Sequence, residues 1–385
     1  MENISCIVLG GYVNSFNVIR ELYDSGVRDI ALIDYGKSIA KKSNRITSYS
    51  VIAKNSTDLL NSLLDHKKTS NKLVVFPTDD SHLRFLNEIY DQIKGFVYIP
   101  FNNDTLLQSL DKFHQYHMCE ELGVPYPKTV NLTKFEDFEK IRSFDFPILI
   151  KPNIKNDSLS VFRTMVLNSE GDIDINQEKF SIFFDNKFTF VASELIPGDD
   201  TNIFAYTGFV NKTGTIMNEW IGKKLTQYPD NYGVFSSASN QAPVAVLDQG
   251  RRLLEGMNLR GICEPEFKYD QRDQKYKLME INLRSMMWHR VGFLDGIALH
   301  KSMYDDAAGN TPKTNIQNQN KRIHLVYLKH EILNLCARRG YWKHFKYNVF
   351  SNNVSFALFD KKDLKPFLYD LPSLLKGILK ICLKR

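Results

Sequence analysis

The sequence predicts a mixed α/β protein whose first quarter is organised differently from the rest. Short apolar runs alternate with segments of helical periodicity up to about residue 105, which is typical of a parallel sheet covered by helices. After about residue 145, apolar runs follow one another across polar turns, which is typical of antiparallel strands. The chain of 385 residues is also too long for one simple core, so two or three packed units are expected.

The N-terminal unit has the order strand, glycine turn, helix, strand, acid. Residues 4–10 (ISCIVLG) form an apolar strand that ends in Gly10-Gly11, and the later strand 30–33 ends at Asp34. This order is that of a Rossmann-like dinucleotide fold. Because GGYVNSF lacks the third glycine of the GxGxxG fingerprint, a domain that has lost its cofactor is favoured over one that binds NAD. Further strands of this unit are expected at residues 73–76 and 98–100.

The middle of the chain predicts one helix and then a series of strands. Residues 111–122 have helical periodicity, and Gly123 ends that helix. The strand 146–151 (FPILIK) ends on Lys151, whose ammonium is either a solvated strand end or an anion ligand. Other strands are expected at 161–167, 188–194, 203–210 and 215–224, and a helix at 246–258.

Residues 262–290 (ICEPEFKYDQRDQKYKLMEINLRSMMWHR) predict a β-hairpin with one strongly polar face. Glu280, Asn282 and Arg284 alternate with apolar residues and share a face, and Glu266 lies on the polar face of the partner strand. Two carboxylates and an amide oxygen would then converge, and such hard oxygen ligands suit Mg²⁺. The alternative is an ordinary solvated sheet face. The opposite faces carry Met279, Ile281 and Leu283 on one strand, and Phe267 and Tyr269 on the other.

Composition and cysteine placement indicate a globular protein of a reducing compartment. The chain is 43% hydrophobic and 24% charged, and its five scattered cysteines include no CxxC pair. The N-terminus resembles a first strand and not a signal peptide, and no apolar run reaches the length of a transmembrane helix. We therefore expect a cytoplasmic protein, with association at the inner face of the membrane as a further option.

Positive charge is concentrated beyond residue 320. Residues 321–385 contain 14 Lys and Arg but 4 Asp and Glu, whereas the whole chain carries a net charge of +6. The C-terminal segment LPSLLKGILKICLKR has leucines on one helical face and lysines off it, which suits an anionic membrane surface. A terminal helix docked on the body with its lysines outward is the equal alternative. No nucleic-acid-binding motif is recognisable, so nucleic acid is not expected as a partner.

Six segments in register resemble the ATP-grasp superfamily over residues 4–310. They are LGGYVNSFNVIREL, DSHLRFL, DKFHQYHMCEELGVPYPKT, FPILIKP, SELIPGDD and EFKYDQRDQKYKLMEINLR. Within the superfamily, IPGDDTN and KYDQRDQKYKLMEINLR are most similar to carboxylate–amine ligases of bacterial cell-wall and surface-polysaccharide pathways, including the D-aspartate ligases. The resemblance implies a Rossmann-like pre-ATP-grasp domain (1–108), an ATP-grasp N-terminal lobe (109–187), a C-terminal lobe with the Mg/ATP site (188–310), and a linker with a basic amphipathic tail (311–385).

The resemblance also implies roles for individual residues. The phosphates of ATP would contact Lys112, Lys151 and Lys224, and Lys223 is the competing choice for Lys224. The adenine of ATP would meet Glu194, Leu195 and Ile196. The ribose would meet Asp200. Magnesium, two ions with Mn²⁺ as a substitute, would be held by Glu266, Glu280 and Asn282. Arg284 and Lys224 would be catalytic: Arg284 by stabilising an acyl phosphate or tetrahedral intermediate, and Lys224 as a further basic residue near the phosphates. Trp288, His289 and Arg290 are expected near the acceptor substrate, His289 as a general base, although a core position is the alternative for Trp288.

The implied activity is ADP-forming synthesis of an amide from a small carboxylate, an amino acid by preference, and an amine acceptor. The acceptor class would be a cell-wall or surface-glycan precursor, and a homodimer is compatible with the sequence. One departure from the family pattern is that NIKNDSLS, with no glycine, follows Pro152 where many members have a glycine-rich phosphate loop. Asn153, Asn156 and Ser158 could supply side-chain donors there. The rival interpretations are a membrane-associated ATP-binding protein without ligase activity, and an ATP-grasp enzyme of another reaction type.

Overall fold

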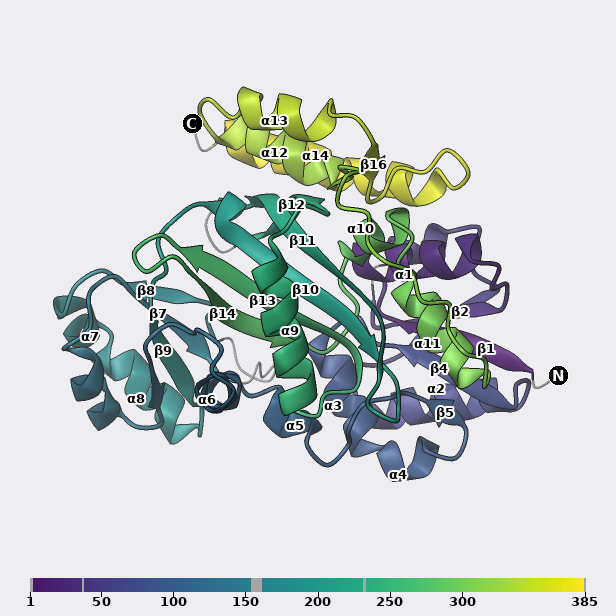
Figure 1. Ribbon diagram of the computed structural model, residues 1–385, viewed down its shortest axis with the longest axis horizontal. Helices are drawn as coiled ribbons and strands as arrows, with labels where there is room; N and C mark the ends of the chain where they lie inside the picture. Colours follow the sequence, from purple (N-terminus) through teal and green to yellow (C-terminus); the bar gives the residue numbers. More distant parts are fainter. Residues whose placement is uncertain (1–2, 37, 154–160, 231–232, 384–385) are drawn as a thin grey trace.

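The computed structural model describes residues 3–36, 38–153, 161–230 and 233–383. It confirms the mixed α/β class, and its strands form three sheets. Figure 1 shows a small lobe at one end, the N-terminal domain at the other, a large sheet between them, and the C-terminal helices across one edge of that sheet.

The N-terminal domain is a parallel five-stranded sheet of order β3-β2-β1-β4-β5. Its central strands are almost completely buried because helices cover both faces, which explains their continuous apolar runs. Gly10, directly after β1, has φ +89°, and an added Cβ there would meet Thr78 at 2.7 Å, so the turn requires glycine. The strands are β1 (Ile4–Leu9), β2 (Ile30–Asp34), β3 (Ser48–Val51), β4 (Lys72–Phe76) and β5 (Val97–Tyr98). The helices are α1 (Val13–Asp24), η1 (Ala40–Lys42), α2 (Ser56–Lys67), α3 (Asp80–Glu88), α4 (Tyr90–Ile93) and α5 (Leu106–Ser109).

The small lobe is a four-stranded antiparallel sheet of order β6-β9-β7-β8, backed by short helices. Its core is rich in phenylalanine: Phe138, Phe180 and Phe190 are fully buried and pack edge to face around one another. The strands are β6 (Thr129–Leu132), β7 (Ile148–Pro152), β8 (Met165–Leu167) and β9 (Phe190–Glu194). The helices are α6 (Lys112–Glu121), η2 (Phe135–Ile141), α7 (Gly171–Ile175) and α8 (Gln177–Asp185).

The large lobe is a seven-stranded sheet of order β14-β13-β10-β11-β12-β15-β16. The predicted hairpin is confirmed as β13 (Gly261–Asp270) and β14 (Lys275–Asn282), at one edge of this sheet. The other strands are β10 (Ile203–Val210), β11 (Ile216–Tyr228), β12 (Val234–Ser239), β15 (His324–Val326) and β16 (Val354–Phe356). The helices of this part are η3 (Asp200–Asn202), α9 (Val244–Gly256), α10 (His289–Leu294) and α11 (Leu299–Ala307).

The C-terminal region contains more structure than the linker and tail that the sequence predicts. It adds β15 and β16 to the large sheet and supplies α12 (Leu328–Ala337), α13 (Trp342–Val349) and α14 (Lys365–Cys382). The fully buried Glu331 of α12 ties these helices to the sheet by accepting hydrogen bonds from Thr226 and Ser236, each at 2.7 Å. Arg20 of α1 also donates to the Phe356 carbonyl at 2.9 Å. The region is therefore an integral part of the folded body.

One hydrophobic core joins the N-terminal domain to the large lobe. Phe16 of α1, Trp220 of β11 and Leu325 of β15 belong to the same buried cluster. Trp288 belongs to this cluster, is fully buried and meets Trp220 edge to face, with ring centroids 5.5 Å apart. The cluster also contains Val8 of β1 and Ile262 of β13, so this shared packing holds one face of the N-terminal sheet against the large lobe that carries the hairpin.

Candidate active site

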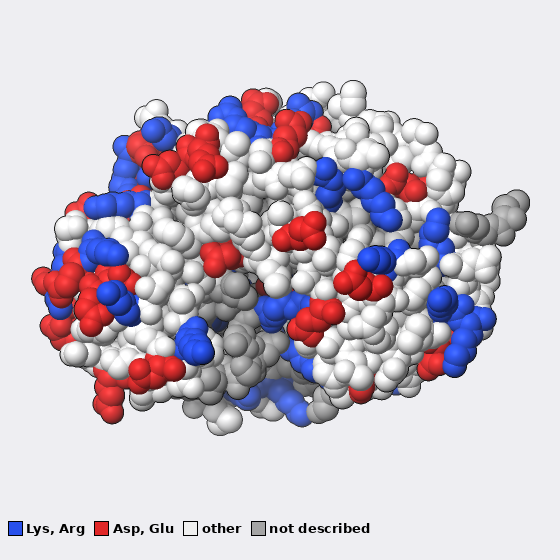
Figure 2. All heavy atoms as spheres, turned by 90° about the horizontal axis from the view of Figure 1, so that it is seen from below, with Lys and Arg blue, Asp and Glu red and all other residues white. Residues whose placement is uncertain are grey.

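A deep cleft lies where the three parts of the molecule meet. Its volume is ≈ 640 Å³, in the range of cofactor and small-molecule sites. The small lobe contributes Lys151, the large lobe Glu266 and the N-terminal domain Asp79, among other lining residues. Figure 2 shows this face hollowed, with Lys and Arg side chains inside the hollow. The combination of basic groups and carboxylates suits an anionic ligand accompanied by a cation.

The hairpin brings the predicted metal ligands together on the cleft side. Glu266 and Glu280 are directly opposite each other across β13 and β14, and both line the cleft with Asn282. The side-chain NH₂ group of Asn282 donates a hydrogen bond to Glu266 Oε1 at 3.2 Å. The side-chain carbonyl oxygen of Asn282 takes no part in this contact. A register shift after Glu266 explains why Met279 also lines the cleft, although strict alternation places it on the opposite face.

Lys224, on the next-but-one strand of the sheet, reaches the same cluster. Its Nζ lies 2.5 Å from Glu266 Oε2, and both side chains are largely buried. Burial pulls the pKa of Lys224 down, but the Glu266 carboxylate outweighs this effect and leaves the pKa raised. Burial raises the pKa of Glu266, and the nearby Lys224 ammonium offsets only part of that increase. Lys223, the competing choice, is not among the cleft-lining residues, and its ammonium stands over the Phe204 ring.

A third carboxylate, Glu264, lies beside this cluster and was not predicted. It is fully buried, pairs across the strands with Asn282, and its Oε1 has no hydrogen-bond partner among the described residues. Burial raises its pKa to about 7, against the opposing charge of Lys224. The i, i+2 spacing from Glu266 in EPEF could have identified it, since such residues share a strand face.

The predicted phosphate lysines come from two elements of the small lobe and line the cleft together. Lys112 is the first residue of α6, and its Nζ donates to the Asn153 carbonyl at 3.3 Å. Lys151 lies in β7, so burial of the neighbouring apolar residues fixes its backbone while its side chain faces the cleft. Asn153 turns its side chain to Phe113, Asn131 and Thr189. The other two proposed lid donors, Asn156 and Ser158, lie outside the described residues.

The three residues predicted as an adenine hinge lie at the end of β9 and directly after it. The Glu194 carboxylate is occupied by the Lys128 amide at 3.1 Å and by Arg272 at 3.1 Å, so this residue can offer only its backbone. The Leu195 amide donates to the Pro147 carbonyl. Among the described residues the Ile196 amide has no hydrogen-bond partner, and all three residues line the cleft. A ring nitrogen of a base could accept from that amide.

Asp200, the predicted ribose acid, also lines the cleft. Its Oδ2 accepts from the Gln227 amide at 3.1 Å, and burial raises its pKa above the usual range. Lys268, two residues after Glu266 on β13, also lines the cleft near Asp200, and burial lowers its pKa.

Arg284 lines the end of the cleft that is formed with the N-terminal domain. It is 8% exposed and pairs with Asp80 at the start of α3. Burial disfavours its charge, but the Asp80 carboxylate outweighs burial and leaves the pKa raised. A permanently charged guanidinium therefore lies at this end of the cleft, and its planar group suits a carboxylate or an acyl-phosphate oxygen.

The structure separates the three residues that were expected around the acceptor. Trp288 borders the cleft, but it is fully buried and its indole N–H donates to Glu264 at 2.7 Å. His289 is not among the cleft-lining residues: its Nε2 lies 2.6 Å from Glu264 Oε2, and its Nδ1 accepts from the Met286 amide. Burial, with His300 nearby, lowers its pKa well below the usual value. Arg290 also lies away from the cleft and donates to Asp24 at 2.7 Å.

The residues present fit a nucleotide with a divalent cation. The Lys224 ammonium occupies the position beside Glu266 where a cation would be drawn, and Glu266, Glu280 and Asn282 supply hard oxygen donors. Among the described residues there is no cluster of three or more His, Cys, Asp and Glu suited to a metal, so such an ion would depend on the amide and on ligand oxygens as well. That sharing is usual for Mg²⁺.

Comparison with known proteins gives likenesses of sequence and of fold. No protein-family model matches the chain. A D-aspartate ligase of Enterococcus faecium (strain Aus0004) is 25% identical over 258 residues, which are 63% of this chain and 60% of that protein; the match thus spans less than two thirds of the relative's length. The ADP complex of N5-carboxyaminoimidazole ribonucleotide synthetase superposes with a TM-score of 0.64 at 14% identity, over 87% of this chain and 84% of that one. An L-amino acid ligase from Bacillus licheniformis has a TM-score of 0.58 at 12% identity, over 80% of this chain and 74% of that one.

Proposed function

We propose that this chain, which has the ATP-grasp fold, is an ATP-dependent carboxylate–amine ligase. The observation that carries the proposal is the convergence in one cleft of Glu266, Glu280 and Asn282 with the basic residues Lys112, Lys151, Lys224 and Arg284. The sequence likeness to a D-aspartate ligase supports a substrate that is an amino acid. A solvated sheet face would not bring these residues together in one cleft.

The reaction makes an amide in two steps. A substrate carboxylate oxygen attacks the γ-phosphorus of ATP, which releases ADP and forms an acyl phosphate. The amine then attacks the acyl carbon, inorganic phosphate leaves, and the amine gives up a proton. Because phosphoryl transfer requires little covalent chemistry from the protein, catalysis is mainly positioning and stabilisation of charge.

The basic residues supply that stabilisation. Lys112, Lys151 and Lys224 place positive charge where phosphate oxygens gather it, and each such donor is worth about 100- to 1000-fold in rate. Arg284, held in place by Asp80, presents a planar cation to the substrate carboxylate or the acyl phosphate. Lys224 can contact the phosphates only if its ammonium separates from the Glu266 carboxylate. The contributions of Lys224 and Glu266 to the reaction are therefore linked.

Magnesium, when bound by Glu266, Glu280 and Asn282, would neutralise charge on the β- and γ-phosphates. Two ions, with Mn²⁺ as a substitute, are part of the proposal. The hinge at Glu194, Leu195 and Ile196 would hold adenine through backbone groups, and Asp200 would accept from the ribose hydroxyls.

The ligase proposal is tested by ADP release from ATP and Mg²⁺ across a panel of amino acids, with cell-wall and surface-glycan precursors as acceptors. ADP release that needs both an amino acid and an amine, with a product heavier by the amino acid minus water, is the expected result. ADP release that depends instead on bicarbonate would favour the rival interpretation of an enzyme with this fold and another reaction type, ATP-dependent carboxylation. ATP binding with no turnover on any substrate would favour a binding protein.

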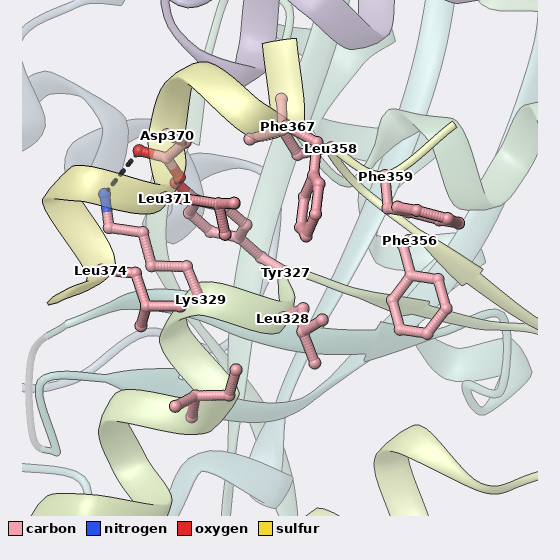
Figure 3. A pocket seen from close by; sticks show the side chains of 11 residues that line it. Tyr327, Leu328, Lys329, Phe356, Leu358, Phe359, Phe367, Asp370, Leu371 and Leu374 are labelled. Carbon is pink, nitrogen blue, oxygen red and sulfur yellow. Dashed lines mark hydrogen bonds and ion pairs between the residues drawn. The ribbon is translucent and has the colours of Figure 1, made fainter. Parts of the chain in front are cut away.

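We also propose that the acceptor is met at an anionic membrane surface. Among the described residues no helix combines the length and apolarity needed to cross a bilayer. Helix α14 is docked on the body, since the buried Asp370 pairs with Lys329 at 2.9 Å (Figure 3). On its outer side, leucines at positions 364, 368, 375 and 379 are 42–61% exposed and share one face, beside the exposed Lys376 and Lys380.

A small apolar groove of ≈ 80 Å³ lies between α14, α12 and β16, lined by residues such as Phe356, Phe359 and Leu374 (Figure 3). Its apolar lining next to the leucine face extends the surface that could enter a lipid interface. The membrane proposal thus needs both faces of α14: one docked on the protein and one exposed.

Point variants test this proposal better than deletion of the tail, which would also remove the buried Asp370. Leu375→Gln with Leu379→Gln should lower binding to phosphatidylglycerol-containing vesicles at least about tenfold, because two exposed leucines lose their transfer to lipid. The matched control is Ile175→Gln with Ile182→Gln, two exposed isoleucines of the small lobe. Equal vesicle binding by the leucine variant and the control would refute the membrane contact.

A further inference from the structure

The C-terminal helices reach the nucleotide end of the cleft through one arginine. Arg338, the residue directly after α12, extends toward the turn that carries Asp200 and the loop that carries Asp230. Its Nη1 lies 3.6 Å from Asp200 Oδ2 and its Nη2 lies 3.2 Å from Asp230 Oδ1. One guanidinium therefore bridges two segments that border the cleft, although Arg338 itself is not among the lining residues.

The contacts of Asp200 are divided between its two oxygens. Oδ2 accepts from the Gln227 amide and faces Arg338. No described residue donates a hydrogen bond to Oδ1, and Asp200 is one of the residues that line the cleft. With Oδ2 held by protein groups and Oδ1 without a described donor, the carboxylate of this cleft-lining residue can accept from a ligand hydroxyl in a fixed geometry.

Helix α12 also positions Gln227, whose amide makes the other contact to Asp200 Oδ2. Asn334 donates to the Gln227 carbonyl at 2.9 Å, and the Gln227 amide in turn donates to Asp200. The buried Glu331 fixes α12 against β11 and β12 through Thr226, Ser236 and Ser237. Both partners of Asp200 Oδ2 are thus set by a helix that the sequence analysis assigned to the tail.

Charge gives a reason for an arginine at this position. Asp199 and Asp230 both lie near enough to Asp200 to disfavour its ionised form, and burial acts in the same direction. Arg338 and the Gln227 amide counteract these effects. Nη1 of Arg338 is buried and has no hydrogen bond to a described residue, so the cation is held by its ion pairs and by the Tyr341 ring, 5.0 Å away.

We propose that Arg338 is a positioning residue of the nucleotide site, which holds Asp200 so that its Oδ1 accepts from the ribose hydroxyls. The inference rests on the proposed ATP site and adds to it the C-terminal helices as a necessary part. Removing the guanidinium leaves Asp200 tethered by the Gln227 amide alone, next to two other carboxylates.

The test compares ATP with 2′,3′-dideoxy-ATP by titration calorimetry on the full chain with Mg²⁺. Wild-type protein should bind ATP about tenfold more tightly, since hydrogen bonds to a charged group are lost with the hydroxyls. Arg338→Ala should reduce that preference to about threefold or less and leave the affinity for the dideoxy nucleotide within about twofold, as expected when one charge-assisted contact loosens. Arg338→Lys should restore part of the preference, and Arg339→Ala, the exposed neighbour, should leave it unchanged.

Equal loss of affinity for both nucleotides in Arg338→Ala and Arg338→Lys would overturn the positioning role and show a structural one. An unchanged ATP preference in both variants would overturn it too, while the ligase proposal would stand. A wild-type chain that binds neither nucleotide would overturn the ATP site itself. Comparison of the variants by circular dichroism and thermal melting shows whether each is folded, and Arg338→Lys carries the test if the alanine variant is not.

Discussion

The buried pair of Lys224 and Glu266 should show strong energetic coupling in the absence of ligands. Their side chains are 13% and 4% exposed and the charged atoms are 2.5 Å apart. Breaking such a pair from one side leaves an uncompensated buried charge and costs about 3–5 kcal/mol, whereas replacing both partners by neutral residues is often nearly neutral. Glu264 and Glu280 also lie near Lys224 and partly replace the lost partner, so we expect about 3 kcal/mol for Glu266→Gln.

Scanning calorimetry without Mg²⁺ or nucleotide measures this coupling. Glu266→Gln should lower the melting temperature by about 5 °C, and the double variant Lys224→Met/Glu266→Gln should recover most of that loss. The matched control is the pair of Lys94 and Asp91, which are 2.7 Å apart but 57% and 87% exposed, so Lys94→Met and Asp91→Asn should be additive. Additive effects of Lys224→Met and Glu266→Gln would refute the account of a buried, mutually neutralising pair.

Two further predictions concern single residues. Glu280→Gln should reduce ATP turnover at least about 100-fold while the circular dichroism spectrum stays unchanged, because one ligand of the proposed cation is lost from a cleft-facing position; an active variant would remove the hairpin from the site. His82 is buried with its Nδ1 facing the Thr78 and Asp79 amides, and burial lowers its pKa to about 4. Below the unfolded pKa of about 6.5 the unfolded chain takes up the proton first, so stability should fall by up to about 3 kcal/mol as the pH falls from 6.5 to 4. Melting temperatures of His82→Gln across this range should fall less steeply than those of the wild type, and equal slopes would contradict the prediction.

Local pattern was sufficient to predict the elements that carry the site. Alternation along 262–284 identified the hairpin and its polar face, and the glycine turn after Leu9 identified the first parallel strand. Alternation could not predict that Met279 lines the cleft. The register shift that places it there depends on the pairing of β13 with β14 and not on the sequence of either strand alone.

Contacts between distant segments account for the other differences. Arg290 follows the hairpin directly, yet Asp24 of α1 draws it away from the cleft. His289 resembles a general base in sequence, but Glu264 and the Met286 amide occupy both of its ring nitrogens. The polar and basic composition of residues 311–385 suggested a linker and tail, because sequence gives no sign that Glu331 would be buried among the hydroxyls of β11 and β12.

The central claim is that a carboxylate is activated by ATP in this cleft before an amine attacks it. Its most direct test uses an amino acid labelled with ¹⁸O in its carboxylates, together with ATP, Mg²⁺ and an amine acceptor that supports turnover. The acyl-phosphate mechanism predicts that one ¹⁸O atom passes to each inorganic phosphate released, as seen by the mass of that phosphate. Amide formation with all ¹⁸O retained outside the phosphate would contradict the claim.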